Sequence, residues 1–305
     1  MGNPLPIQEE EQDQRRIYVV TDGLKSPQTR RVYSSAFNKF IQHIQNPNLQ
    51  TLIDTKTQII EAKIISYLEY LCNERKLSYS TILCHYSSIQ HFFEINDVQL
   101  NLRKIKKFLP SEDNENYRGD RPYSVSEIQQ ILDRCDIRER VIILLLTSTG
   151  MRVGAIPGLR ISDIKKMDEF NLYLIKVYAN SRRDRYYSFC TPECTKVIDD
   201  YLAYRKRWGE EIKDSNPVVR SHISIDNPFT AKTARPIGVR AIQLIIKDLL
   251  NEAGLVYDKG QVMITHGFRK FFITNLDRAG VLWSTREYLS GHKLPGQDAS
   301  DGLFL

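Results

Sequence analysis

Three short stretches place arginine and histidine where they could hold an anion. They are "TGMRVGA" with Arg152, "THGFRKFF" with His266 and Arg269, and "LSGHK" with His292. His266 and Arg269 are three residues apart, so on a helix they share one face. A helix that begins at Thr265 or His266 adds free backbone N–H groups and the positive end of its dipole. Together these groups describe a phosphate site.

Each stretch also has a purely structural interpretation. Arg152 follows a glycine at the end of an apolar helix and could cap the carbonyls of that helix. In either case a guanidinium beside a buried helix should meet a carboxylate, backbone carbonyls or an anionic ligand. A His-x-x-Arg pair can occur by chance on an amphipathic helix, and His292 alone is a weak signal. The order of the motifs therefore matters more than any one of them.

The elements that must position these residues fall into two predicted units. Residues 1–24 are polar and acidic and are expected to form a flexible N-terminal tail without an apolar leader. Apolar residues then recur at helical spacing over residues 26–44, 57–76 and 78–96, and Ser26 with Pro27 is typical of a helix start. These helices predict a compact helical domain over residues 25–108.

The composition of residues 109–121 predicts a linker, and a second domain is expected over residues 122–305. Ser124 and Glu127 form a capping box, and residues 138–150 predict a buried helix that ends at Gly150. Alternation from Leu172 and in "YYSFC" predicts two strands joined by the basic turn "ANSRRDR". Four further helices are expected over residues 194–209, 239–254, 265–280 and 285–292.

The net charge and the cysteine content indicate the kind of partner and the redox compartment to expect. The 305 residues carry 43 Lys and Arg against 37 Asp and Glu, a mild basic excess of +6. Five cysteines and no apolar leader predict free thiols in a reducing cytoplasm. The "CTPEC" segment lacks a second pair of ligands, so no metal site is expected. No apolar run approaches the ~20 residues that a membrane span needs.

The order of the motifs resembles the tyrosine recombinase (phage integrase) family over residues 26–300. Arg152, a basic hairpin, His-x-x-Arg and Leu-x-Gly-His follow one another after a helical domain and a linker. The wording "HGFRKFF" and "GHKLPGQDAS" is similar to archaeal integrases of mobile elements. The resemblance implies a mainly α fold, with a helical core-binding (SAM-like) domain followed by an α+β catalytic domain that carries a small antiparallel β-hairpin or sheet.

The resemblance also implies an activity, site-specific DNA recombination. In this family a tyrosine hydroxyl attacks the scissile phosphate, which leaves a 3′-phosphotyrosine and a free 5′-hydroxyl. By resemblance, Arg152 and Arg269 are the two guanidinium forks that hold the phosphate. His266 hydrogen-bonds the phosphate and helps to move the proton, and His292 is a further donor. The implied partner is double-stranded DNA bound by a homotetramer, with no metal ion, small-molecule cofactor or membrane.

Two departures from the family pattern bear on catalysis. The hairpin turn has no lysine; Arg182 or Arg183 takes its place, and we assign Arg183, although arginine gives up a proton poorly. No tyrosine follows His292, and Asp301 stands where the nucleophile is expected. Tyr288 precedes His292, which is against the family order, so a packing role is expected for it. A carboxylate at Asp301 would occupy the site rather than attack.

These departures predict a truncated or inactive recombinase. A non-catalytic DNA-binding derivative and a subunit that receives its tyrosine in trans stay open, as do a type IB topoisomerase-like enzyme and a helical protein with no nucleic-acid role. "RKIKK" could follow a phosphate backbone or be a solvated helix end. The predicted DNA contacts are Arg30, Arg31, Arg103, Lys104, Lys106, Lys107, Arg182 and Arg185.

Overall fold

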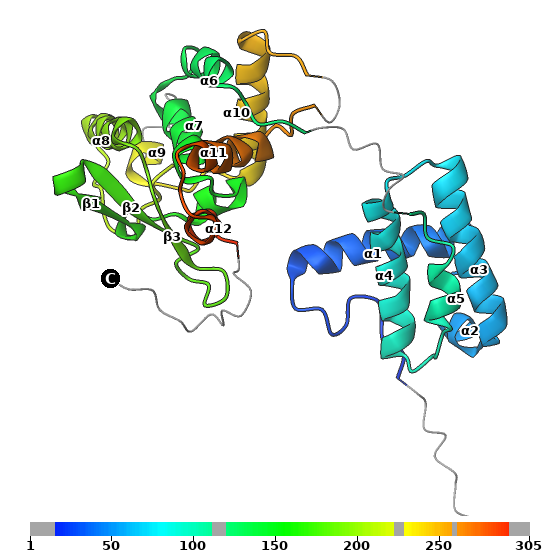
Figure 1. The fold of residues 1–305 in the computed structure, drawn as a ribbon. Coiled ribbons are helices and arrows are strands. Elements are labelled where there is room, and N and C mark those ends of the chain that lie inside the picture. Colours follow the sequence, from blue (N-terminus) through cyan, green and yellow to red (C-terminus); the bar gives the residue numbers. More distant parts are fainter. Residues whose placement is uncertain (1–15, 112–119, 223–228, 258–260, 293–305) are drawn as a thin grey trace, which may run out of the picture. The chain divides into compact units, whose positions relative to one another are not determined.

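The computed structural model describes residues 16–111, 120–222, 229–257 and 261–292 (Figure 1). The chain divides into two compact units, residues 1–116 and residues 117–305. The first unit is helical, and the second combines helices with a small antiparallel sheet. The predicted fold class is therefore confirmed. No helix of the described ranges is long and apolar enough to cross a membrane.

The first unit is built on two long helices that pack against each other, α1 and α4. Serine side chains start both, since Ser26 accepts from Thr29 N and Ser78 accepts from Thr81 N. The aromatic rings of Phe37 and Phe92 meet at 4.5 Å in the core. The elements of this unit are α1 (Pro27–His43), α2 (Leu49–Asp54), α3 (Thr57–Glu69), a π-helical turn (Tyr70–Glu74), α4 (Tyr79–Ile95) and α5 (Leu102–Lys106).

The predicted flexible tail is wrong over residues 16–24, which pack on the first unit. Val20 is buried in the core of the unit. The side chain of Asn96 accepts from Tyr18 N at 2.9 Å and donates to Tyr18 O at 3.0 Å. Apolar contacts and hydrogen bonds between the Asn96 side chain and the Tyr18 backbone therefore order this segment. The rest of the predicted tail, residues 1–15, lies outside the described residues.

Helix α5 passes through the basic "RKIKK" stretch and is anchored to α3. The carboxylate of Glu61 accepts from Asn101 N at 2.8 Å and from Lys104 Nζ at 3.0 Å. The backbone hydrogen bond from Asn101 is the main cause that lowers the pKa of Glu61, with Lys104 adding to it. Ile105 is completely buried. One side of this stretch therefore faces the core, and the basic side chains lie on the other.

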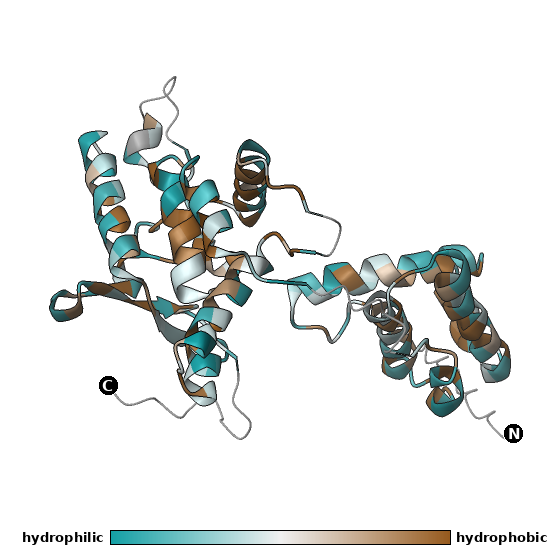
Figure 2. Ribbon diagram, turned by 45° about the horizontal axis from the view of Figure 1, so that its top comes forward, coloured by the Kyte–Doolittle hydropathy of each residue, from teal (hydrophilic) through white to brown (hydrophobic). Residues whose placement is uncertain are grey.

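The second unit is built around α7, in which every residue from Val141 to Thr149 is buried. Helices α8 and α11 pack against α7, and α12 packs against α11 and β3. Figure 2 shows hydrophobic and hydrophilic residues alternating along the helices of both units, as amphipathic helices require. The helices of this unit are α6 (Val125–Leu132), α7 (Ile137–Thr149), α8 (Pro192–Arg207), α9 (Phe229–Lys232), α10 (Val239–Glu252), α11 (His266–Arg278) and α12 (Trp283–Ser290).

Three antiparallel strands form the sheet in the order β1 (Ile164–Met167), β2 (Leu172–Val177) and β3 (Tyr186–Phe189). The predicted hairpin is β2 and β3, paired with Leu174 opposite Phe189. Strand β1, which the sequence pattern did not reveal, adds to the other edge of β2. The five cysteines are free thiols, and the described residues contain no group of three side chains that could hold a metal ion.

Candidate active site

The guanidinium of Arg269 lies at the centre of the candidate site and is 1% exposed. Its Nη1 donates to the carbonyl of Gly150 at 2.8 Å, at the end of α7. Its Nε and Nη2 atoms are also buried, and no described residue accepts a hydrogen bond from them. These two groups form the edge of a guanidinium that matches two oxygens of a phosphate. The hydrogen bond from Nη1 therefore leaves the Nε–Nη2 edge without a protein acceptor.

Gly150 permits this tether because it ends α7 in the left-handed conformation, with φ of 60°. A Cβ built on Gly150 would lie 2.3 Å from Cδ1 of Phe272 on α11. Only glycine lets the two helices approach this closely while its carbonyl faces Arg269. The sequence left open whether Arg152 caps α7. In the structure Arg269, 119 residues along the chain, donates to this carbonyl instead.

The start of α11 is held in place by residues 120–123. The hydroxyl of Tyr123 donates to Ile264 O at 2.9 Å, and its ring closes on Gly267, where a Cβ would lie 2.8 Å away. Lys270 Nζ forms an ion pair with the carboxylate of Asp120 at 2.8 Å. Asp120 and Arg121 fall in the predicted linker of residues 109–121, yet they pack on the second unit; residues 112–119 lie outside the described part of the chain.

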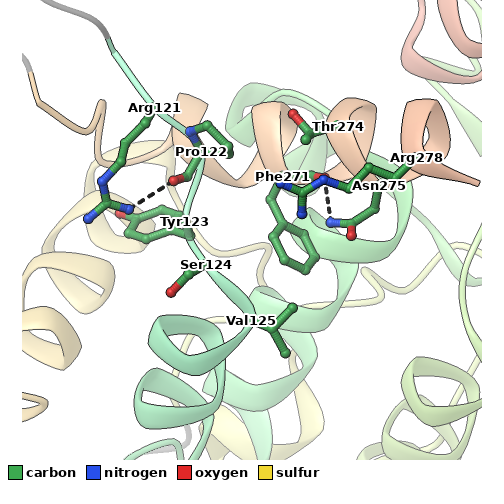
Figure 3. A pocket seen from close by; sticks show the side chains of 9 residues that line it. All are labelled: Arg121, Pro122, Tyr123, Ser124, Val125, Phe271, Thr274, Asn275 and Arg278. Carbon is green, nitrogen blue, oxygen red and sulfur yellow. Dashed lines mark hydrogen bonds between the residues drawn. The ribbon is translucent and has the colours of Figure 1, made fainter.

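A hollow of about 340 Å³ separates residues 121–125 from the far end of α11 (Figure 3). Phe271, Asn275 and Arg278 lie on its α11 side, across from Arg121. The guanidinium of Arg121 is not free for an anion there, because both carboxylate oxygens of Glu127 hold it at 2.7 and 2.8 Å. Arg269 does not line this hollow, so its Nε–Nη2 edge lies elsewhere in the second unit.

His266 is the first residue of α11 and is exposed. Neighbouring protein atoms remove part of its hydration, which is the main cause that lowers its pKa, and the charges of Arg269, Lys270 and Arg152 lower it further. Asp120 opposes this shift. The imidazole is therefore neutral at pH 7 and can accept a proton. The predicted pairing of His266 and Arg269 on one helix agrees with this placement.

Arg152 is exposed, and its side chain makes no hydrogen bond or ion pair with the described residues. Of the three partners considered for it, a carboxylate and backbone carbonyls are not found among the described residues, which leaves an anionic ligand; Met151 enters the core, and Arg152 then turns to the surface. Its charge nevertheless lowers the pKa of Arg269 after the larger effect of burial. It also acts on His266 and Tyr178. Arg152 therefore belongs to the same cluster and is open to an anionic ligand.

His292 follows the left-handed Gly291 at the end of α12. Its Nδ1 lies 2.7 Å from the carboxylate of Glu287, which can only accept, so Nδ1 carries a proton. The other nitrogen, Nε2, then accepts when the ring is neutral and donates when the ring is protonated. The predicted donor role of His292 thus requires the imidazolium form. Tyr288 is half-buried on the same helix. Asp301 lies outside the described residues.

Two tyrosines that flank the hairpin turn complete the cluster, and the sequence reasoning missed both. Tyr178 and Tyr186 have ring centroids 6.5 Å apart. Burial raises the pKa of each hydroxyl, and the charges of Arg152 and Arg269 oppose that rise. The sequence signal that could have revealed them is the presence of one tyrosine on each side of "ANSRRDR". Because the two ends of a hairpin turn lie side by side, these tyrosines must be neighbours.

The three hairpin arginines, Arg182, Arg183 and Arg185, are all exposed. The turn is held by Ser181, whose hydroxyl donates to the carboxylate of Asp184 and accepts from Asp184 N, both at 3.0 Å. Among the described residues none of the three arginines forms a hydrogen bond or an ion pair. No contact between Arg183 and Arg269 is found among the described residues, so the catalytic role of Arg183 stays a prediction.

The basic residues predicted to contact DNA from the first unit differ in whether their side chains are already bound to protein groups. Arg30 donates through Nε to Leu24 O at 2.6 Å. Arg31 lines a hollow of about 290 Å³ between α1 and α4, together with Lys39 and Thr81. Lys104 is held by Glu61. The remaining three, Arg103, Lys106 and Lys107, are exposed.

Comparisons with known proteins agree with this arrangement. The sequence model of the phage integrase family matches residues 123–295, and that of the phage integrase N-terminal SAM-like domain matches residues 20–96. The chain belongs to the phage integrase family. Tyrosine recombinase XerC of Leptospira interrogans is 23% identical over 287 residues, which cover 90% of this chain and 82% of the relative. XerC of Lactobacillus leichmannii is 25% identical over 215 residues, 67% of each chain.

Solved structures share the fold. A lambda integrase dimer, residues 75–356, bound to a COC′ core site has a TM-score of 0.61 at 16% identity and covers 90% of this chain and 88% of that one. The XerH recombinase in a post-cleavage complex with a palindromic difH substrate also has a TM-score of 0.61, at 15% identity, and covers 87% of this chain and 73% of that one.

Proposed function

We propose that this chain is the DNA-binding and phosphate-binding body of a site-specific tyrosine recombinase. The observation that carries the proposal is the free, buried Nε–Nη2 edge of Arg269, held in place through Nη1 by Gly150 O. Arg152 supplies a second guanidinium to the same cluster and is open to a ligand. The relatives, named as tyrosine recombinases, and the DNA-bound structures that share the fold support this assignment.

In the proposed reaction a tyrosine oxygen forms a bond to the scissile phosphorus, and the bond from phosphorus to the 5′-oxygen breaks. The two guanidinium groups stabilise the charge that spreads over the non-bridging oxygens. His266 accepts the proton of the attacking hydroxyl, and His292 hydrogen-bonds the phosphate. Arg183 stabilises the leaving 5′-oxygen by its charge. Removing one such donor costs roughly 10²–10³ in rate.

The proposed reaction needs a tyrosine nucleophile, and within the 305 residues no tyrosine follows His292. A tyrosine in cis, outside these 305 residues, is the first candidate for it. A tyrosine donated in trans within a tetramer on DNA is the second candidate, and a non-catalytic DNA-binding derivative is the third. The missing hairpin lysine supports the third candidate, and the helical domain before the linker favours a recombinase over a type IB topoisomerase. We place the protein in the cytoplasm of an archaeal host that carries the mobile element.

Two experiments test the proposal separately. Reading the source DNA and its transcript past the codon for Leu305 shows whether a tyrosine codon follows in any frame. Restoring such a segment should produce a covalent adduct on a nicked duplex substrate. If no tyrosine codon follows, cleavage by this polypeptide alone is excluded, and a DNA-binding derivative or donation in trans is left.

The phosphate site is tested with orthovanadate, which mimics a five-coordinate phosphorus. Calorimetric titration of the full chain should show binding that Arg269→Gln weakens by at least about tenfold, because a hydrogen-bonded charge pair contributes about 1.5–3 kcal/mol. Arg278→Gln is the matched control, since it removes the same charge from the other end of α11. Equal losses in both variants would show a general effect of charge and refute a site at Arg269.

A further inference from the structure

Three buried polar atoms of Arg269 and Tyr186 make no hydrogen bond of normal geometry with any described residue. They are Nε and Nη2 of Arg269 and the hydroxyl of Tyr186. Arg269 is 1% exposed and Tyr186 is 4% exposed. The hydroxyl and the guanidinium are neighbours, and their charge interaction and a weak hydrogen-bonding contact oppose the effect of burial on the pKa of each group. The guanidinium of Arg269 on α11 and the hydroxyl of Tyr186 on β3 therefore offer neighbouring hydrogen-bond donors that could bind one ligand.

The structure holds the hydroxyl of Tyr186 firmly. Tyr186 and Ser188 lie on the buried face of β3, and Ser188 Oγ donates to Thr149 O at 3.2 Å, one residue before the Gly150 tether. On the other side the ring packs against Gly291, where a Cβ would lie only 2.3 Å from Tyr186 Cε1. The hydroxyl therefore cannot move without shifting the turn that carries His292.

A phenylalanine would serve the packing at this position better than a tyrosine. A buried hydroxyl without a hydrogen-bond partner destabilises a protein, because the group loses its hydrogen bonds to water. Burial also raises the pKa of Tyr186 to about 12, so the hydroxyl keeps its proton at neutral pH. A protonated hydroxyl beside two cationic groups is suited to donate to an anion and not to attack it.

We propose that Tyr186 is a further phosphate-binding residue, whose hydroxyl donates to a non-bridging oxygen held by the Nε–Nη2 edge of Arg269. The inference rests on the proposed function, and it extends the phosphate site from the arginines and histidines to the first residue of β3. The ligand is a phosphodiester or its five-coordinate transition state. Tyr186 gives one more neutral donor to the oxygen on which negative charge builds.

The test compares orthovanadate binding by the full chain with that of Tyr186→Phe. We expect the variant to bind about 10- to 100-fold more weakly, as the loss of a hydrogen bond to a charged group predicts. Tyr187→Phe is the matched control, because it removes the same atom from the opposite face of β3. The control should bind within about twofold of wild type.

Stability measured on the same samples separates a binding role from a structural one. Tryptophan fluorescence during urea denaturation reports on the second unit, which holds both tryptophans, Trp208 and Trp283. Tyr186→Phe should unfold at the same or a higher urea concentration than wild type. A variant that binds vanadate as tightly as wild type, or that unfolds much earlier, overturns the inference. If neither wild type nor Arg269→Gln binds vanadate, the proposed phosphate site is refuted together with the role of Tyr186.

Discussion

The substitution Gly150→Ala tests whether the end of α7 sets the position of Arg269. The new methyl group would lie 2.3 Å from Phe272 Cδ1 and 2.9 Å from Cγ, on a backbone with φ of 60°. The left-handed conformation alone costs a non-glycine residue about 1–2 kcal/mol. Forcing α11 away from α7 adds about 1–3 kcal/mol of overpacking. We therefore expect the second unit to lose about 2–5 kcal/mol of its free energy of unfolding.

Gly254→Ala is the matched control, because Gly254 has φ of 69° and nothing within 4 Å of a built Cβ. It should show the backbone cost alone, about 1–2 kcal/mol. Urea denaturation followed by tryptophan fluorescence measures both variants on the second unit. Gly150→Ala should also weaken vanadate binding, since the carbonyl that anchors Arg269 moves with the helix end. Equal losses of stability and unchanged vanadate binding would refute this reasoning.

Two further predictions concern pH and salt. Arg121 is the main cause that lowers the pKa of Glu127 to about 2, so this carboxylate stabilises the second unit above about pH 4.5 and loses that effect as pH falls towards 2. Glu127→Gln should remove that pH dependence and lower the free energy of unfolding at pH 7 by about 1–2 kcal/mol, a figure that allows for solvent screening at Arg121. Glu211→Gln, in an exposed ion pair, should change neither quantity. Acid denaturation measures both variants. DNA affinity should fall steeply with salt, and neutralising Arg103, Lys106 and Lys107, which form no ion pair among the described residues, should reduce the slope of log affinity against log salt by about 3. Lys213→Gln, an exposed lysine outside the predicted contacts, should leave that slope unchanged, and an unchanged slope in the triple variant would favour the solvated helix end.

Features that depend on neighbouring residues could be predicted from the sequence. Ser124 and Glu127 form the predicted capping box, and Ser26 starts α1 as expected. Gly150 ends α7, and the hairpin has the predicted strands. Each of these signals acts within a few residues of the chain, where amino-acid type constrains the backbone directly.

Short elements that depend on distant partners could not be predicted. Helix α5 has five residues and is held by Glu61, about forty residues away. Strand β1 has four residues and exists because β2 offers an edge. Helices this short have little stability of their own, so packing decides whether they form. Residues 16–24 follow the same rule, since their order comes from Asn96 and the core of the first unit.

The sequence alone determined which functional groups this protein offers, namely Arg152, His266, Arg269 and His292 in a family order. Tertiary structure decided what each group is free to do. The Gly150 carbonyl takes one nitrogen of Arg269 and leaves two, and Glu287 takes one nitrogen of His292. Burial and close packing also brought Tyr186 to the same place. Such pairings join residues far apart in the chain, so no local pattern could specify them.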